Sequence, residues 1–343
     1  MNPYISYEAI NTKIKSKKGH ILTKEDWEQI LGFTKVEQFT EFLKNKSEIK
    51  KAFQDVEYND IHRDSLETIL GIYKTIEIEQ ILRYCSGPYK EFLITLLMES
   101  EIADISLILR KISRGEDLKW IEQRFVHSEN YTKLDYTKLL SSRSVVEFTE
   151  NLKGSPYYHG LKTLTNEDAI KREFHIEMKL QVVLYKNLMK KAEKLNDKDI
   201  ETVKEIVGFK IDLENIQWIY RAISFYNISP EEMLIYSLDG GKKITYSRLK
   251  SLCYVKTKEE FKNLVKNYMN FDLFKGVSDS TTDIGVDYNM NYFLKNNKYY
   301  NIGSVISYIY KLGIIIDDLT CIVEGIKYKV PKEKLKGYLV HKF

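Results

Sequence analysis

The sequence predicts an all-α protein built from three copies of one helical unit. The chain has only five prolines in 343 residues, each at a plausible element boundary, so long helices are permitted nearly throughout. Apolar residues recur at steps of three or four, with charged residues between them, as expected for helices with one buried face. A pattern of apolar residues around Phe39, Phe148 and Phe261 repeats without gaps, which indicates an internal repeat.

The repeated pattern sets the boundaries of the copies. The three phenylalanines are 109 and 113 residues apart, each close to a third of the chain. The aligned positions are Leu22-Thr23, Tyr131-Thr132 and Ile244-Thr245, then Trp27, Tyr136 and Leu249, then Ile30, Leu139 and Leu252, and finally Leu43, Leu152 and Val265. We therefore predict domains at residues 1–127, 128–238 and 239–343, with the phenylalanines in equivalent buried positions. The alternative is that amphipathic helices align with one another by chance.

Capping boxes of the form Ser/Thr-x-x-Glu predict several helix starts. They occur at Thr34 to Glu37, Ser144 to Glu147 and Thr257 to Glu260, and Ser229-Pro230-Glu231-Glu232 adds a proline at the first helical position. The clearest long amphipathic helix is predicted over residues 170–195. The segment 278–301, rich in Asp, Thr and Asn, predicts a loop or a poorly packed approach to the last helices.

A second alignment supports the repeat. Asp104, Asn215 and Asp318 each begin a similar stretch, an acid or amide followed by aliphatic residues, at intervals of 111 and 103 residues. These stretches end at Arg110, Arg221 and Glu324, so the third copy departs from the other two at its last position.

Charge and composition argue against several classes of protein. The 53 basic and 49 acidic residues give a net charge of +4 and are interleaved, which favours a solvated helical surface over a nucleic-acid interface. One basic cluster, Lys13, Lys15, Lys17 and Lys18, could contact phosphate.

No apolar run is long enough to span a membrane, and the start lacks the pattern of a secretory signal. The three cysteines are far apart without a C-x-x-C pair, which favours a cytoplasmic setting.

No motif indicates catalysis, a cofactor or a metal. The sequence Gly240-Gly241-Lys242 lacks the first glycine and the Ser/Thr of a phosphate-binding loop, so a flexible glycine turn is the better interpretation. His175-Ile176-Glu177 has no P-C-x-x-C after it, and Asp317-Asp318 is not followed by a third acid four residues later. A site assembled only in the folded chain stays open as an alternative.

Several stretches together resemble a known family. They are Asp212-Leu213-Glu214-Asn215-Ile216, Ile228-Ser229-Pro230-Glu231, Gly240-Gly241, the opening Tyr7-Glu8-Ala9-Ile10-Asn11, and Ile302-Gly303 to Ile309. Over essentially its full length the chain resembles the C subunit of the bacterial and archaeal V-type (A-type) ATPases, known as the d subunit in the eukaryotic vacuolar enzyme. The resemblance implies three similar helical domains around a pseudo-threefold axis, forming a funnel.

The resemblance also implies a function. The chain would be a non-catalytic central-stalk adaptor, peripherally attached to the membrane, that links the membrane rotor ring to central-shaft subunits of the D and F type. Arg110, Arg221, Glu214 and Asn215 are the candidate partner-binding residues, with pairing between helices inside the domain as the alternative role. The alternative functions are a helical-repeat scaffold with another partner and an undetected helical enzyme.

Overall fold

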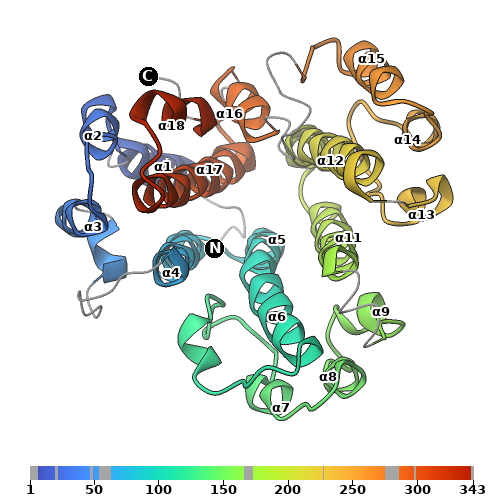
Figure 1. Cartoon of the computed structure of the whole chain (residues 1–343), viewed down its shortest axis with the longest axis horizontal. Helices are drawn as coiled ribbons and strands as arrows, with labels where there is room; N and C mark the ends of the chain where they lie inside the picture. Colours follow the sequence, from blue (N-terminus) through green and yellow to red (C-terminus); the bar gives the residue numbers. More distant parts are fainter. Residues whose placement is uncertain are drawn as a thin grey trace. The chain divides into compact units, whose positions relative to one another are not determined.

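The fold is helical throughout the part of the chain that can be described. The computed structural model describes residues 7–19, 22–46, 49–53, 63–165, 173–226, 228–274, 286–296 and 299–340. Every regular element in these ranges is a helix, and none is a strand (Figure 1). The predicted all-α class is therefore confirmed. No helix within the same ranges is long and apolar enough to cross a bilayer.

The chain divides into two compact units. Unit 1 consists of Met1–Asp104, Trp120–Thr132 and Asn297–Phe343, and unit 2 of Ile105–Lys119 and Lys133–Asn296. Unit 1 contains α1 (Tyr7–Gly19), α2 (Lys24–Ile30), α3 (Val36–Asn45), the 3₁₀ helix η1 (Ile49–Phe53), α4 (Arg63–Leu82), α5 (Gly87–Leu96), the start of α6 (Met98–Ser113), the 3₁₀ helix η2 (Ile121–Arg124), α17 (Ile302–Lys327) and α18 (Lys332–Tyr338). Unit 2 contains the end of α6, α7 (Tyr136–Leu140), α8 (Val145–Asn151), α9 (Tyr158–Leu161), α11 (Glu173–Ala192), α12 (Asp197–Phe225), α13 (Pro230–Ile235), α14 (Tyr246–Cys253), α15 (Lys258–Met269) and α16 (Val286–Asn296).

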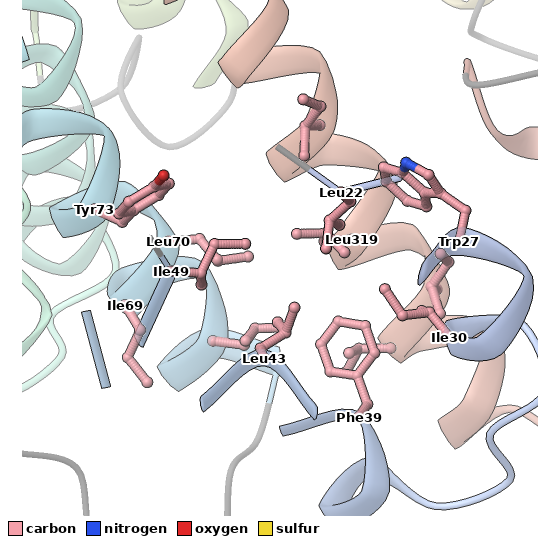
Figure 2. Close-up of a cluster of buried hydrophobic side chains, with 14 of the residues drawn as sticks. Leu22, Trp27, Ile30, Phe39, Leu43, Ile49, Ile69, Leu70, Tyr73 and Leu319 are labelled. Atoms are coloured by element: carbon pink, nitrogen blue, oxygen red, sulfur yellow. The ribbon is translucent and has the colours of Figure 1, made fainter. Parts of the chain in front are cut away.

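One apolar core joins the two ends of the chain in unit 1. Trp27 of α2, Phe39 and Leu43 of α3 and Leu70 of α4 belong to the same buried cluster as Leu319 of α17 (Figure 2). Burying a side chain of this size contributes roughly 1.5–3 kcal/mol relative to leaving it in water. α17 also packs against α1. The last long helix therefore completes the core of the first helices. The division into three domains at residues 1–127, 128–238 and 239–343 stays a prediction from the sequence.

Unit 2 is built around α12. This helix of 29 residues packs against α11, α14, α15 and α16. On the α15 side, Tyr220 of α12 meets Phe261 with ring centroids 6.1 Å apart. Phe148, on α8, is also fully buried. The burial predicted for Phe39, Phe148 and Phe261 is thus confirmed for all three.

The predicted helix starts hold in three of four cases. The hydroxyl oxygens of Ser144 and Thr257 accept hydrogen bonds from the amides of Glu147 and Glu260, both at 3.1 Å. Ser229 caps α13 in the same way, at 3.2 Å, with proline next in the chain.

The predicted box at Thr34 to Glu37 is wrong by one residue. α3 has Lys35 as its N-cap, and the side chain of Gln38, not Glu37, accepts hydrogen bonds from the amides of Thr34 and Lys35. Gln38 stands directly before Phe39, as Glu147 and Glu260 stand directly before Phe148 and Phe261. Gln38 therefore takes the position that Glu147 and Glu260 have in the other two predicted copies.

Two further predictions concern longer segments. The helix predicted over 170–195 is confirmed as α11, which ends three residues early at Ala192, while residues 170–172 lie outside the described ranges. The loop predicted over 278–301 is wrong in its middle, because residues 286–296 form α16. Phe293 of α16 stacks on Phe209 of α12 with ring centroids 4.3 Å apart, and Met290 is buried. Residues 278–285 and 297–298 lie outside the description.

Candidate interaction site

The four residues predicted to bind a partner lie on α6 and α12. Arg110, in the last turn of α6, is half-buried. Glu214 and Arg221 on α12 are also half-buried, and because they are seven residues apart they share one side of the helix. Glu214 forms an ion pair with Lys210 at 2.9 Å. Partner binding by these residues stays a prediction.

Asn215 has a different environment from its neighbour Glu214. Its side chain is 0% exposed. Its amide nitrogen donates to the carbonyl of Leu238 at 2.9 Å, and its oxygen accepts from the amide of Leu238 at 2.7 Å. One side chain therefore satisfies both backbone groups of a residue in the segment that follows α13. This geometry favours a role inside the unit for Asn215.

The Gly240-Gly241 turn encloses a carboxylate of the same unit. The carboxylate of Asp212 accepts hydrogen bonds from the amides of Lys243 at 2.6 Å and Ile244 at 3.0 Å. Gly240 has a φ of +94°, and a Cβ on Gly241 would overlap the Asp212 carboxylate. The amides that a phosphate-binding loop would offer to a nucleotide are thus directed at Asp212. Burial raises the pKa of Asp212 to about 6, although these amides lower it.

The other two aligned positions make the same kind of bond as Asn215. Asp104 accepts from the amide of Val126 at 3.0 Å, and Asp318 accepts from the amide of Val340 at 2.8 Å. The partners are 22, 23 and 22 residues beyond Asp104, Asn215 and Asp318. We call these three contacts the return bonds, because each holds the chain where it returns to its long helix. The sequence pattern aligned these three side chains but did not indicate what they bind.

The predicted basic cluster is partly buried. Lys17 is 3% exposed, and its ammonium group lies 2.6 Å from the carboxylate of Glu77 on α4. Gln80 accepts a further hydrogen bond from Lys17 at 2.8 Å, and the hydroxyl of Tyr308 on α17 donates to Glu77. Lys17 is therefore engaged inside unit 1 and does not serve as a phosphate contact there.

His175 and the cysteines Cys85 and Cys253 are buried and packed inside the units. His175 is buried, stacks on Tyr236 with ring centroids 4.6 Å apart and lies 3.1 Å from Glu232. Burial raises the pKa of the Cys85 thiol to about 12 and that of Cys253 to about 11, so both thiols are protonated at neutral pH. Among the described residues, no three His, Cys, Asp or Glu side chains are grouped as a metal site would require.

Comparison with known proteins gives a match over nearly the whole chain. The family model described as ATP synthase (C/AC39) subunit matches residues 10–338. The C subunit of the A-type ATP synthase of Archaeoglobus fulgidus is 22% identical over 346 residues, covering 98% of this chain and 96% of that protein. The corresponding subunits of Methanosarcina acetivorans, 20% identical over 344 residues (98% and 93% covered), and Methanosarcina mazei, 21% identical over 272 residues (79% and 73% covered), are also similar.

Proposed function

Because this chain belongs to the ATP synthase (C/AC39) subunit family, as the match over residues 10–338 shows, we propose that it is the central-stalk adaptor of a rotary A/V-type ATPase. In this role it is a non-catalytic subunit that joins the membrane rotor ring to the central-shaft subunits of the D and F type and transmits torque between them. The full-length match carries the proposal. The family resemblance seen in the sequence is confirmed by the same match.

The described helices suit a part that must transmit force without deforming. Torque transmission needs elements held to one another by buried contacts, and the return bonds tie three long helices to the chain that follows them. The bond of Asn215 to Leu238 is buried, so leaving that backbone group without a partner costs about 1–3 kcal/mol. The ion pair of Lys17 with Glu77 likewise joins α1 to α4.

We further propose that residues 1–127, 128–238 and 239–343 are copies of one unit arranged around a pseudo-threefold axis as a funnel. Three recurring features support the repeat: a fully buried phenylalanine, a preceding Gln or Glu whose side chain accepts from the amide four residues earlier, and a return bond. The axis and the funnel rest on the family resemblance.

Co-purification tests the adaptor role. The tagged chain is expressed in its own organism, membranes are dissolved in a mild detergent, and the isolated material is analysed by mass spectrometry. We expect shaft and ring subunits of the rotary ATPase to be recovered with it in fixed ratio. Recovery of the chain alone, or with unrelated proteins, would contradict the adaptor role and favour a scaffold with another partner.

A hydrolysis assay addresses the enzyme alternative. We expect the isolated chain to show no ATP turnover above that of a mock preparation. Turnover that survives purification and disappears on one substitution in this chain would support an undetected helical enzyme.

Partner binding by the predicted residues is proposed to be polar. Arg110, Glu214 and Arg221 are half-buried charges, and exposed ion pairs contribute only about 0–1 kcal/mol each and are screened by salt. Binding to the shaft should therefore weaken as salt rises. Affinity that is unchanged between low and high salt would mean that the contact is mainly apolar.

A further inference from the structure

The three copies differ in charge at the same place. The gaplessly aligned windows 22–44, 131–153 and 244–266 contain three, four and six basic residues and five, three and two acidic residues. Their net charges are therefore −2, +1 and +4. The third window forms α14, α15 and the loop between them, within unit 2 (Figure 1). One copy of an otherwise repeated unit has become strongly basic.

The added positive charge replaces acidic or neutral residues of the other copies. Arg248 stands where the first two copies have Asp26 and Asp135. Lys250 stands where the first copy has Glu28. These side chains are exposed, so the helix core does not require the change.

Four of these six cations have no carboxylate partner in the part of the chain that the structure describes. Lys262 pairs with Glu259 and Lys266 with Asp272. Arg248, Lys250, Lys256 and Lys258 form no ion pair within the described residues. An unpaired cation can form an ion pair with another molecule without first breaking one inside its own chain.

Aromatic rings lie beside three of the four. The Lys250 ammonium group lies 5.9 Å from the ring centroid of Tyr254, and that of Lys258 lies 5.8 Å from the ring of Phe225. The Arg248 guanidinium lies 5.0 Å from the ring of Tyr268. Such contacts attract the charged group to the ring face and so restrict the positions that the charge can take. Tyr254 itself donates to Glu231 at 2.8 Å.

We propose that Arg248, Lys250, Tyr254, Lys256 and Lys258, which we call the α14–α15 surface, bind a carboxylate-rich surface of a protein subunit in the rotary complex. The inference rests on the proposed function for the identity of the complex. Arg and Tyr are enriched at protein interfaces, and a basic surface complements the charge of an acidic partner. In the third window the exposed aromatic residues are Tyr246 and Tyr254, which suit such an interface.

Carbodiimide crosslinking of the intact complex tests the contact directly. The reagent joins a lysine amine to a carboxylate only when the two already touch. We expect mass spectrometry to find Lys250, Lys256 or Lys258 joined to an Asp or Glu of another polypeptide. Absence of these crosslinks, while lysines of the window 131–153 do crosslink to a partner, would overturn the proposal.

A set of charge variants measures the contribution to binding. The variant Lys250→Gln/Lys256→Gln/Lys258→Gln is added to complex prepared without this chain. We expect about tenfold weaker binding at low ionic strength and a smaller difference at high salt. The control Lys133→Gln/Lys138→Gln/Arg143→Gln removes the same charge from exposed side chains of the second window and should bind as the wild type does. Replacing the three lysines by Arg should restore binding and still block the crosslink.

The outcomes separate the two proposals. If the wild type fails to join the complex, the proposed function is wrong. If the wild type joins and the triple Gln variant, folded by circular dichroism, joins equally well, only the α14–α15 surface is wrong. If that variant joins the complex normally but no longer floats with phosphatidylglycerol vesicles, the surface binds lipid and the protein-binding proposal is overturned.

Discussion

At the scale of single residues, the most informative groups are the polar side chains buried on α12. Asp212 and Asn215 are both fully buried, and each holds backbone groups of the chain that follows α13. An unpaired backbone group in such a position costs free energy that no exposed contact recovers. Asp212, Asn215 and the Gly240-Gly241 turn all belong to the stretches that carry the family resemblance. The structure shows that these stretches contact one another, because the turn encloses Asp212.

Replacing Asn215 tests its structural role. Asn215→Leu keeps the volume similar but leaves both the amide and the carbonyl of Leu238 without a partner, so we expect a loss of about 2–5 kcal/mol in the free energy of unfolding. Urea denaturation measures this. The control Gln217→Leu, half-exposed on the same helix, should change stability by less than about 0.5 kcal/mol. A loss below about 1 kcal/mol for Asn215→Leu would mean that the return bond does not stabilise unit 2.

The carboxyl of Asp212 predicts a pH dependence. Its pKa of about 6 in the folded chain lies above the usual value near 3.8, so folding binds a proton between these two pH values. The contribution of Asp212 to stability is therefore largest below about pH 4 and falls as pH rises towards 6. Asp212→Asn does not titrate, so the stability lost on this substitution should be larger at pH 4 than at pH 7. Equal losses at both pH values, measured by urea denaturation, would contradict the raised pKa.

The sequence indicated burial of Asn215 only indirectly. It lies between Glu214 and Ile216, in a run that is otherwise apolar on several sides of the helix, which signals an interior position. Its partner Leu238 is 23 residues away, beyond α13, and no local pattern specifies that contact. A polar residue in an amphipathic pattern was for this reason interpreted as a binding residue.

At the scale of elements, α1 is held by a buried ion pair. Lys17 and Glu77 are 3% and 1% exposed, and Tyr308 of α17 also contacts Glu77. Burying a charge is costly, and the pair is tolerated because each charge is compensated by the other and by hydrogen bonds. The contact determines how α1 is positioned against α4 and α17.

Single and double substitutions should therefore differ sharply. Lys17→Met leaves the Glu77 carboxylate without its ammonium partner, and we expect a loss of about 3–5 kcal/mol. The double variant Lys17→Met/Glu77→Met removes both charges and should recover part of that loss. Lys336→Met, which breaks an exposed pair with Glu333, should cost less than about 1 kcal/mol. Additive losses in the double variant, by thermal or urea unfolding, would show that the pair is not coupled.

Helix starts were predictable where one side chain makes the cap. Ser144, Ser229 and Thr257 accept from the amide three residues on, so a four-residue pattern contains the whole interaction. At α3 the N-cap is Lys35 and the bonds are accepted by Gln38, which the Ser/Thr-x-x-Glu pattern excludes. α16 was not predicted because three Asn residues interrupt its eleven residues, and because the helix it packs against, α12, is distant in the sequence.

At the scale of the whole molecule, the two units combine segments distant in sequence. The apolar faces of α2, α3 and α4 were predictable from their periodicity, but their partner α17 starts more than 200 residues later. Periodicity shows that a face is buried and does not show which helix covers it. The division into units could not be derived from the sequence for that reason.

A truncated chain tests this organisation. A chain ending at Asn296 retains all of unit 2 but lacks α17 and α18. Because α17 covers the core of unit 1, we expect amides of α2, α3 and α4 to lose their protection from hydrogen exchange, while those of α11 and α12 keep it. If residues 1–127 formed a domain that folds alone, α2 to α4 would stay protected in the truncated chain. The full-length chain is the reference.

The pairing of α4 with α17 also has a consequence during synthesis. Translation adds roughly 5–20 residues per second, so the first helices leave the ribosome roughly 10–40 s before α17 exists. During that time the apolar sides of Trp27, Phe39 and Leu70 have no covering helix from their native core. The nascent chain therefore presents a binding site for molecular chaperones that the finished protein lacks. That exposure can end only after translation has passed Lys327, because α17 is then complete and able to cover these side chains.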